Sequence, residues 1–360
     1  MTPGIPYHER LVLAHPRPSA TAPLLSVAIP HYKHRRHLQV VLDSLLPQTF
    51  DDFEIVISDD QSPDDSAAVI PALLRDAGRA FRYYRQPHNL GYDGNVRFCL
   101  AASRGRYVLL LGNDDALTTP TALQDLADAL RALGYPEVAI TNHRDCATGQ
   151  VTRRALATKI LGAGPDAAAR FFRSFSFVSG LVFERAAAAR HETARWDRSV
   201  YYQIYLACRI AAAGGRIGAL DICTVAKDVR VDDQGVFNYV ARWSGARRSF
   251  QSRHTGIDSV LRVTVDAIAP HVPERGYSAL VRRVATQLLA VTYPFWLFEY
   301  RRIAGWSFAV GVARGLWPGA LLAEYALGLL IPARLFNRLR DTLAAMVRSR
   351  QQSSKPLRRS

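Results

Sequence analysis

The sequence contains few cysteines, very little lysine and no long apolar run. Its four cysteines (Cys99, Cys146, Cys208 and Cys223) are scattered, and no two of them form a CxxC pair. This pattern argues against a disulfide scaffold or a structural zinc site and favours a reducing compartment. The opening residues contain no apolar segment of the kind that a signal peptide requires, so we expect no cleavable leader.

Two common classes of motif are also missing. No GxGxxG or P-loop pattern occurs in the chain, which disfavours dinucleotide-dependent oxidoreductases and nucleoside triphosphatases. The longest uncharged run in the last third, Val284–Phe298, has 15 residues. That is fewer than the roughly 18–20 residues of a simple membrane-spanning helix.

Positive charge is concentrated at one end of the chain. The sequence has 46 Lys and Arg against 31 Asp and Glu, for a net charge of +15. Residues 235–360 hold 19 of the bases and only 6 of the acids, so the last third carries nearly all of the excess. A basic region predicts an anionic partner, such as lipid headgroups, nucleic acid or phosphate.

The same third mixes apolar stretches with aromatic residues and arginine. Trp296, Trp306 and Trp317 lie close to Arg302 and Arg314. This pattern favours helices that lie on an anionic membrane surface. The alternatives are a buried helical core or an oligomer interface and, least favoured, true membrane spans. We expect no nucleic-acid partner, because the region lacks a recognisable nucleic-acid-binding motif.

The first two thirds alternate short apolar runs with segments of helical periodicity. Five runs predict buried strands, and four segments between them predict amphipathic helices. The strands are expected at residues 25–29, 53–58, 81–85, 107–111 and 138–141, and the helices at 37–46, 66–75, 95–103 and 118–133. Such alternation predicts an α/β domain with a mostly parallel sheet, whose ligand site lies beyond the carboxyl ends of the strands.

Polar and acidic residues follow four of these strands. They are the segments Pro30–Lys33, Asp59–Asp65, Gln86–Tyr92 and Gly112–Asp115. Carboxylates gathered at one edge repel one another unless a cation or a donor-rich ligand lies between them. An Mg²⁺ or Mn²⁺ ion that also binds a substrate diphosphate accounts for such a cluster. Taken singly, each segment is also explained as a helix cap or a turn.

Histidines recur at three-residue spacing just after the first strand. His31, His34 and His37 would suit a metal site by spacing alone. Because they alternate with Lys33, Arg35 and Arg36, we favour a phosphate-facing or solvated loop instead.

Taken together, the four segments that follow the predicted strands resemble the motifs of the family 2 glycosyltransferases of the GT-A fold. The resemblance covers residues 24 to about 218 and is closest to the sugar transferases of bacterial surface-polysaccharide assembly. It implies a Rossmann-like, mostly parallel sheet, followed here by a helical membrane-associated region. It also implies a nucleotide-binding set at the strand ends, made up of Pro30, Tyr32, Asp59, Asp60, Asn89, Gly91, Asn95 and Asn113.

The metal-binding motif of that family, D-x-D-D, falls on Gly112–Asp115. Glycine replaces the first aspartate, which weakens the expectation of tight metal binding. The resemblance leaves Asp114 and Asp115 as ligands for Mg²⁺ or Mn²⁺, where the ion would stabilise the departing nucleotide as a Lewis acid.

The acceptor side departs further from the family. Gly180 matches its Ser-Gly strand, but Tyr202 and Gln203 stand where a Glu-Asp pair is usual, and glutamine cannot be a general base. Tyr202 could instead bind the acceptor. The base is then left among four candidates: Asp197, Asp228, Asp232 and Asp233.

These expectations divide the chain into four parts. Residues 1–23 form an N-terminal extension, 24–234 the GT-A domain, 235–347 a helical, basic, membrane-surface region, and 348–360 a basic, disordered tail that attracts anionic lipid. The expected activity is inverting sugar transfer from a nucleotide diphosphosugar. The expected acceptor is a glycan on a polyprenyl diphosphate, at the cytoplasmic face of the membrane. The alternative is a catalytically degenerate scaffold of a polysaccharide assembly complex.

Overall fold

A computed structural model describes residues 10–16, 21–75, 78–231 and 257–288, together with positions 335, 338 and 342. Contacts divide the chain into two units. The first comprises Met1–Arg242 with Arg262–Val281, and the second comprises Trp243–Leu261 with Arg282–Ser360.

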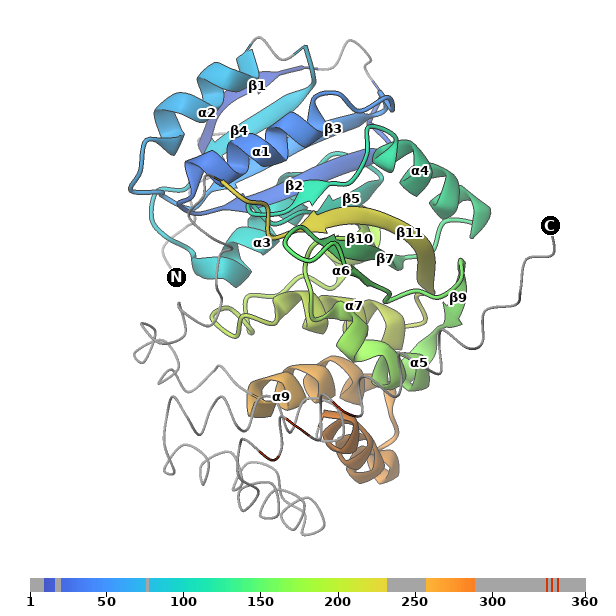
Figure 1. Ribbon diagram of the computed structural model, residues 1–360. Helices are drawn as coiled ribbons and strands as arrows, with labels where there is room; N and C mark the ends of the chain where they lie inside the picture. The colour runs from blue at the N-terminus through green and yellow to red at the C-terminus, as the bar shows by residue number, and fades with distance from the viewer. Residues whose placement is uncertain are drawn as a thin grey trace, which may run out of the picture. The chain divides into compact units, whose positions relative to one another are not determined.

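The first unit is built on one mixed sheet, with strand order β1-β4-β3-β2-β5-β10-β7-β11-β6 (Figure 1). Two short strands lie off this path, since β8 pairs with β7 and β9 with β11. The strands are β1 Leu11–His15, β2 Leu25–His31, β3 Phe53–Asp59, β4 Phe81–Arg85, β5 Tyr107–Leu110, β6 Ala116–Leu117, β7 Val138–Asp145, β8 Val151–Thr152, β9 Lys159–Gly162, β10 Leu181–Glu184 and β11 Ile217–Lys227.

The helices carry apolar residues at helical spacing, which explains why they pack on the sheet. In α1 the buried residues are Leu38, Val41, Leu42 and Leu45, one stripe along the helix. The α-helices are α1 Arg35–Leu45, α2 Ser66–Arg75, α3 Gly91–Ala102, α4 Ala122–Ala132, α5 Gly164–Phe171, α6 Arg185–Arg190, α7 Tyr202–Ala212 and α9 Ile257–Ile268.

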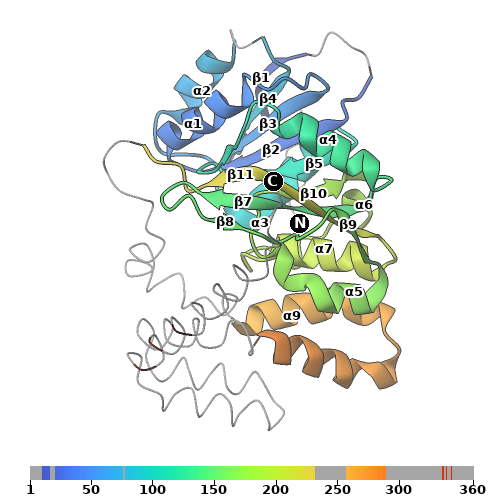
Figure 2. The same cartoon turned by 45° about the vertical axis from the view of Figure 1, so that its right-hand side comes forward.

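The helices cover the sheet in two layers. Helices α1, α2 and α4 lie on one face, over the main hydrophobic cluster (Figures 1 and 2). Helix α3 packs on the opposite face, where Phe98 contacts Val56 and Tyr84 in a second cluster. Because successive residues of a strand point to opposite faces, β3 supplies apolar side chains to both layers.

The predicted α/β rhythm is confirmed between β2 and β7, with all five strands and four helices present. Strands β4, β3, β2 and β5 are parallel. The strand order reverses beside β2, since β3 lies on one side of it and β5 on the other. Such a reversal leaves a crevice beyond the carboxyl ends of the strands, where α/β proteins bind ligands.

Two features differ from the sequence expectation. The predicted extension, residues 1–23, contains the edge strand β1, which pairs antiparallel with β4. Its pattern was hard to recognise because four of its five residues are exposed. The sheet is also interrupted by β10, which lies antiparallel between β5 and β7 although it is later in sequence than both.

Little of the predicted C-terminal region lies within the described residues. Residues 262–281 group with the first unit, beyond the predicted domain end at residue 234. There Asp266 accepts a hydrogen bond from Trp196 Nε1 at 2.8 Å and pairs with Arg195 at 3.1 Å. No helix within the described residues has the length and apolarity needed to cross a membrane. Most of the apolar runs and the tail 348–360 lie outside the described residues.

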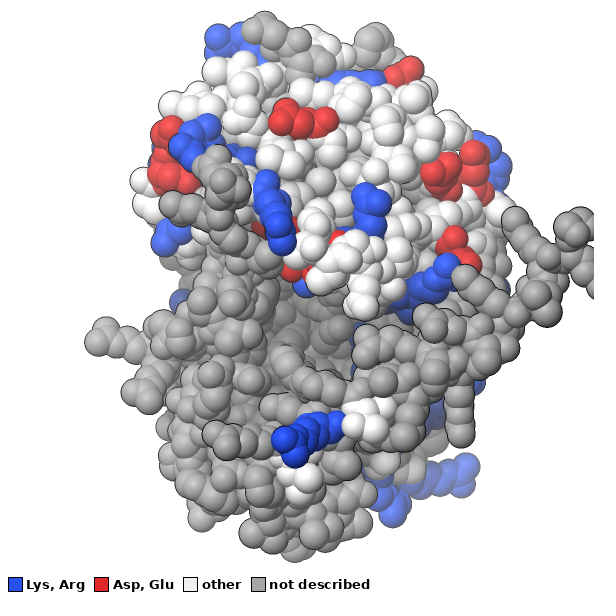
Figure 3. All heavy atoms as spheres, in the orientation of Figure 1, with Lys and Arg blue, Asp and Glu red and all other residues white. Residues whose placement is uncertain are grey.

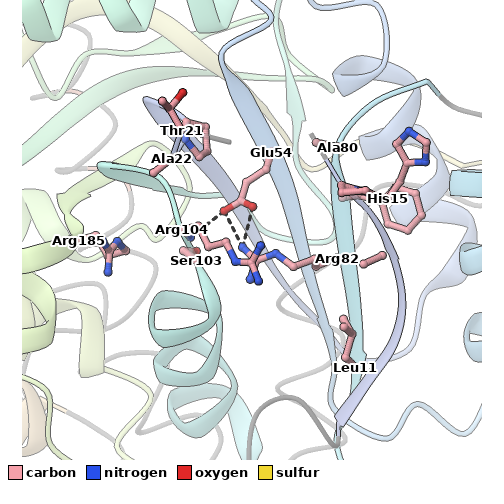
Figure 4. Close-up of a pocket in the computed structure, with 14 residues that line it drawn as sticks. Leu11, His15, Thr21, Ala22, Glu54, Ala80, Arg82, Ser103, Arg104 and Arg185 are labelled. Carbon is pink, nitrogen blue, oxygen red and sulfur yellow. Dashed lines mark hydrogen bonds and ion pairs between the residues drawn. The ribbon is translucent and has the colours of Figure 1, made fainter. Parts of the chain in front are cut away.

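A cavity of about 530 Å³ lies near the amino ends of β3 and β4, away from the crevice (Figure 4). Its polar centre is a buried ion pair, in which Arg82 Nη2 lies 2.7 Å from both carboxylate oxygens of Glu54. Ser26 Oγ and the main-chain N–H of Arg104 also donate to Glu54 Oε1. Because the carboxylate is fully used by the fold, we interpret this pair as structural.

Glu54→Gln should therefore destabilise the protein strongly. The substitution leaves the Arg82 guanidinium buried without its counter-charge, and breaking one side of a buried pair costs about 3 kcal/mol. Urea unfolding monitored by circular dichroism measures the loss. Arg131→Gln, which breaks an ion pair exposed on both sides, is the control and should cost less than about 1 kcal/mol. Equal losses for the two variants would contradict the structural role of Glu54.

Candidate functional site

The loops after β2 and β5 meet at the carboxyl rim of the sheet. Asn113 Nδ2 donates to His31 Nδ1 at 3.0 Å and to the carbonyl oxygen of Lys33 at 3.1 Å. The loop after β3 joins them, since the N–H of Asp60 donates to the His31 carbonyl at 2.8 Å. Hydrogen bonds therefore join three of the predicted strand-end segments.

His31 is a structural member of this rim. Its side chain is fully buried, and burial lowers its pKa to about 4, although Asp59 and Asp64 oppose the shift. The ring is therefore neutral at pH 7. With Nδ1 accepting from Asn113, we assign the proton to Nε2, which donates to Ser66 Oγ at 2.9 Å. Ser66 Oγ in turn donates to Asp64.

Asp59, the first predicted acid after β3, is buried and engaged inside the fold. Its Oδ2 accepts from the Tyr83 hydroxyl at 2.7 Å, and its Oδ1 accepts from the N–H of Ser62 at 2.8 Å. These bonds hold the strand end and the turn that follows it.

Asp60 binds the start of α3. It is 2% exposed, and its carboxylate accepts from the N–H groups of Leu90 at 2.6 Å and Gly91 at 2.9 Å. Burial raises its pKa to about 6, although the two N–H donors act in the opposite direction. A negative charge is favourable here because the N-terminus of a helix carries partial positive charge.

The predicted residues of the third segment complete this connection. Asn89 Nδ2 donates to the Asp60 carbonyl at 3.0 Å. Gly91 adopts φ +76°, a conformation that side chains rarely take. Asn95 Nδ2 donates to the carbonyl of Ser58 at 3.0 Å, while its buried Oδ1 has no hydrogen-bond partner within the described part of the chain.

The two remaining predicted nucleotide residues stand at the end of β2. Pro30 lies opposite Ser58 in the β2–β3 register. The Tyr32 side chain is 41% exposed, and Lys33 Nζ lies 5.0 Å from the centre of its ring. The Tyr32 ring is therefore available at the rim for a stacking contact.

The acid loop after β5 contains a second buried carboxylate. Asp115 is 3% exposed, and it accepts from the Ser179 hydroxyl and, at 2.8 Å, from the N–H of Asp228. Ser179 Oγ also accepts from the N–H of Gly112. Burial raises the pKa of Asp115 to about 7, and the neighbouring Asp114 adds to the shift.

Gly112 makes this packing possible. A Cβ at position 112 would lie 3.0 Å from Asp114 Oδ1 and 3.2 Å from both Asp115 Oδ2 and Ser179 Oγ. These carboxylates therefore occupy the space into which an aspartate at position 112 would extend. The glycine at the first position of the D-x-D-D motif therefore matches the packing of Asp114, Asp115 and Ser179 around it.

The donor set fits a divalent ion that relies on its substrate for further ligands. Among the described residues, no three His, Cys, Asp or Glu side chains converge as a metal-binding group. Asp114 and Asp115 remain adjacent at the rim, and Asp114 is partly exposed. One or two carboxylates completed by substrate phosphates is the usual arrangement for Mg²⁺.

The general-base candidates are placed differently from one another. Asp197 forms a two-point ion pair with Arg97, at 2.9 and 2.8 Å. Asp228 follows β11 with φ +55°, contacts the acid loop through Asp115, and pairs with Lys227 at 2.6 Å. Asp232 and Asp233 lie outside the described residues. Of the two described candidates, Asp228 lies beside the predicted metal ligands, since its main-chain N–H donates to Asp115.

The predicted acceptor-side residues line two neighbouring segments. Tyr202 and Gln203 are buried at the start of α7, and Gln203 Nε2 donates to the Ser176 carbonyl at 3.2 Å. Gly180 has φ +79°, and a Cβ there would collide with Thr141 Oγ1 and Arg154 Nη2. Only glycine fits this turn.

Sequence reasoning did not identify Arg154, which holds the same turn. Its guanidinium donates to the carbonyl oxygens of Thr141, Phe177 and Ser179, at 2.8–2.9 Å. Arg154 lies in a basic loop next to Arg153, so composition alone could not distinguish it. The turn that presents Ser179 to Asp115 therefore depends on an arginine remote in sequence.

Charge on the surface of the described residues is mixed. On the face drawn in Figure 3, Lys and Arg are interspersed with Asp and Glu. A broad basic surface, the usual requirement for binding a nucleic-acid backbone, is not evident among the described residues of that face.

Comparisons with known proteins find similar sequences for part of the chain. Residues 26–177 match the family model described as Glycosyl transferase family 2. The chain is 35% identical over 95 residues to the GalNAc(5)-diNAcBac-PP-undecaprenol beta-1,3-glucosyltransferase of Campylobacter jejuni, covering 26% of this chain and 31% of that protein. It is 34% identical over 96 residues to the abequosyltransferase RfbV of Salmonella typhimurium, covering 26% and 29%. The aligned segments thus span about a third of each relative.

Two solved structures share the fold. TarS of S. aureus, residues 1–349 in complex with UDP, has a TM-score of 0.57 at 14% identity, covering 90% of this chain and 91% of that one. The mannosyltransferase PcManGT of Pyrobaculum calidifontis, in complex with GDP-Man and Mn²⁺, has a TM-score of 0.51 at 16% identity, covering 93% and 89%. At these identities the likeness shows the fold alone.

Asp115→Asn should stabilise the protein more as the pH rises. Folding raises the pKa of Asp115 from its ordinary value of 3.8 to about 7, so the folded wild type becomes less stable as the pH rises between these values. The variant removes the charge and keeps an acceptor for the N–H of Asp228. The difference in melting temperature, variant minus wild type, should rise from pH 5 to pH 8.

Thermal unfolding of the unliganded protein at several pH values measures this difference. Asp43→Asn, which removes an exposed carboxylate on α1, is the matched control for charge removal. A difference that stays flat across the range would contradict an ionisable Asp115 buried in the fold.

Proposed function

We propose that this chain, whose residues 26–177 form a family 2 glycosyltransferase domain, transfers a sugar from a nucleotide diphosphosugar to an acceptor hydroxyl with inversion. The observation that carries the proposal is the junction made by Asn113. It joins the predicted nucleotide-binding turn at His31 and Lys33 to the acid loop that would hold the metal. Nucleotide and diphosphate sites must adjoin in this way for one donor to occupy both.

The donor half of the site follows from the rim residues. The exposed ring of Tyr32 offers a surface for the base. The buried Asp59 and Asp60 act by holding the strand end and the start of α3 in place. Asn95 Oδ1 is a buried acceptor without a partner among the described residues, and it suits a hydroxyl or N–H donor of the nucleotide.

Asp114 is the proposed main ligand of an Mg²⁺ or Mn²⁺ ion, with Asp115 beside it. When bound, the ion neutralises the diphosphate and helps the nucleotide to leave. Asp115 also holds the loop after β5 in place, because it accepts hydrogen bonds from Ser179 and Asp228. The two solved structures that share this fold contain UDP and GDP-Man. They support a nucleotide diphosphosugar as the donor, but they do not identify which one.

The reaction is a single displacement. The acceptor oxygen forms a bond to the anomeric carbon, the bond from that carbon to the diphosphate oxygen breaks, and the acceptor proton passes to a carboxylate. Asp228 is the candidate beside the acid loop. Asp197 is less suited because both of its oxygens bind Arg97.

The proposed acceptor is a glycan on a polyprenyl diphosphate, reached by a protein bound to the cytoplasmic membrane surface. The name of the Campylobacter jejuni relative describes an undecaprenol diphosphate-linked acceptor. The basic, aromatic-rich last third of this chain supports the same proposal, because anionic lipid attracts such segments.

The second candidate function is a non-catalytic scaffold. Two specific departures favour it: Gly112 in place of the first metal ligand and Gln203 in place of the usual base. A scaffold of this kind would keep the fold without a working donor site.

Thermal shift with nucleotides separates the two functions. UDP, dTDP, GDP and CDP are tested with and without Mn²⁺ or Mg²⁺, because a ligand that binds only the folded state raises the melting temperature. One nucleotide should stabilise the wild type in a metal-dependent manner. A nucleotide present at 100 times its Kd adds about 2.7 kcal/mol to the free energy of unfolding.

Asp114→Asn should abolish the metal-dependent part of this shift, and the exposed Asp43→Asn is the matched control. If nucleotide stabilises the wild type and Asp114→Asn equally without metal, the nucleotide site does not depend on a metal ion. No stabilisation by any nucleotide would favour the scaffold.

Membrane binding is tested with vesicles. The full chain should sediment with vesicles containing phosphatidylglycerol more than with neutral phosphatidylcholine vesicles, and salt should weaken the binding. A chain ending at residue 284 should lose this preference, with circular dichroism as the control for folding. Equal partitioning of the two chains would refute a membrane role for the last third.

A further inference from the structure

Asp93 is a buried carboxylate that none of the preceding roles uses. It lies in the first turn of α3 and is 1% exposed. Its Oδ2 accepts from the N–H of Val200 at 2.8 Å, and its Oδ1 accepts from the N–H of Tyr202 at 3.0 Å. Both oxygens therefore bind main-chain groups more than 100 residues away in sequence.

The bond to Tyr202 supplies a cap that the N-cap residue of α7 does not. The helix begins at Tyr202, and its N-cap residue, Tyr201, makes no side-chain cap. The first N–H groups of any helix need partners from outside the helix. Asp93 provides one from a different helix, where its charge also interacts favourably with the N-terminal end of the dipole.

The turn before α7 is strained. Arg198 and Val200 both have positive φ, at 71° and 67°. A β-branched residue such as valine rarely adopts this conformation, which persists only when the surroundings hold it. The hydrogen bond from Val200 to Asp93 is one such restraint.

Helix α3 holds the other end of the turn as well. One turn beyond Asp93, Arg97 forms its two-point ion pair with Asp197. Asp93 and Arg97 are four residues apart and so lie on the same face of the helix. Together they hold both ends of Asp197–Tyr202.

The same helix is attached to the nucleotide rim. Asp60 binds its first N–H groups, and Asn95, two residues beyond Asp93, donates to Ser58 at the end of β3. A single rigid helix therefore connects the proposed donor rim to the segment that carries Tyr202 and Gln203.

We infer that Asp93 is a positioning residue that sets the acceptor-side turn Asp197–Tyr202, and with it Tyr202 and Gln203, relative to the nucleotide rim. The inference rests on the proposed function for its catalytic consequence. Asp93 does not act as the base itself, because both of its oxygens accept main-chain N–H groups and its side chain has no open surface.

The cost of keeping this carboxylate buried supports a specific role. Burial raises the pKa of Asp93 to about 6, although the N–H groups of Val200 and Tyr202 oppose the shift. The charged group that acts on it is Asp197, which adds to the shift and is itself paired with Arg97. An uncharged side chain would be easier to bury. We therefore interpret the carboxylate as being retained for the two hydrogen bonds that it accepts.

The experiment compares Asp93→Asn and Asp93→Ala with the wild type. Asparagine keeps one acceptor oxygen, and alanine keeps none. The matched control is Asp125→Asn, which removes an exposed first-turn aspartate from α4. All proteins are assayed at the same interval below their own melting temperatures, so that lost stability is not read as lost function.

Two measurements, one of binding and one of catalysis, separate a positioning role from a general loss of structure. The first is the affinity for the nucleotide that stabilises the wild type, with Mn²⁺. The second is transfer from UDP-glucose, UDP-N-acetylglucosamine or GDP-mannose to a prenyl diphosphate-linked N-acetylglucosamine probe. Asp93→Asn should keep the nucleotide Kd within about twofold and lose about 10–100-fold in kcat/KM for the acceptor probe, as expected for a misplaced site. Alanine should lose more than asparagine.

Amide hydrogen exchange provides a readout that needs no substrate. In both Asp93 variants the N–H groups of Val200 and Tyr202 should exchange faster, while those of Leu90 and Gly91, held by Asp60, should not. Unchanged exchange at Val200 and Tyr202 would overturn the inference whatever the activity. So would wild-type transfer, or equal losses in nucleotide affinity and transfer.

The two proposals fail differently. If the wild type binds no nucleotide and transfers no sugar, the proposed function is wrong, and the exchange result still decides whether Asp93 holds the turn. If the wild type is active and Asp93→Asn transfers as well as Asp125→Asn, only the positioning role is wrong.

Discussion

Buried carboxylates that accept main-chain N–H groups are the interaction on which the rest of this site depends. Asp59, Asp60, Asp93 and Asp115 are each at most 3% exposed, and each accepts at least one N–H group from a segment that must be held in place. A buried charge is unfavourable unless it is paired or hydrogen-bonded. Each of these acids therefore favours a single conformation of the segment that it binds. Asp60 in this way connects the rim to α3, and Asp93 connects α3 to α7.

The strands and helices around this rim could be predicted because they depend on local patterns. Apolar runs and helical periodicity identified the elements from β2 to β7 except the two-residue strand β6. The strand β1 was missed because one exposed edge strand leaves little periodicity. The place of β10 was missed because nothing in Leu181–Glu184 shows that it inserts between β5 and β7. Strand order depends on pairings distant in sequence, which no local pattern records.

The candidate site could be predicted as a set of residues but not as a set of contacts. The acids after β3 and β5 were identified from the sequence, whereas their bonding was not. Spacing does not show that Asp60 binds the start of α3 while Asp59 binds Tyr83. Nor does it show why glycine stands at position 112, since the reason is the space taken by two carboxylates and Ser179. Asp93 was missed because it lies before the predicted helix 95–103, and because its partners are more than 100 residues away.

The late insertion of β10 has a consequence for how the protein is made. As the chain leaves the ribosome, β5 and β7 are complete before β10 exists, so each has an unpaired edge until residues 181–184 emerge. Unpaired edges invite association with other chains. The region that matches the family model ends at residue 177, so a fragment cut at that boundary would keep both open edges permanently. The smallest unit able to close its own sheet must extend at least through β10, and through β11 if β7 is also to be covered on its far side.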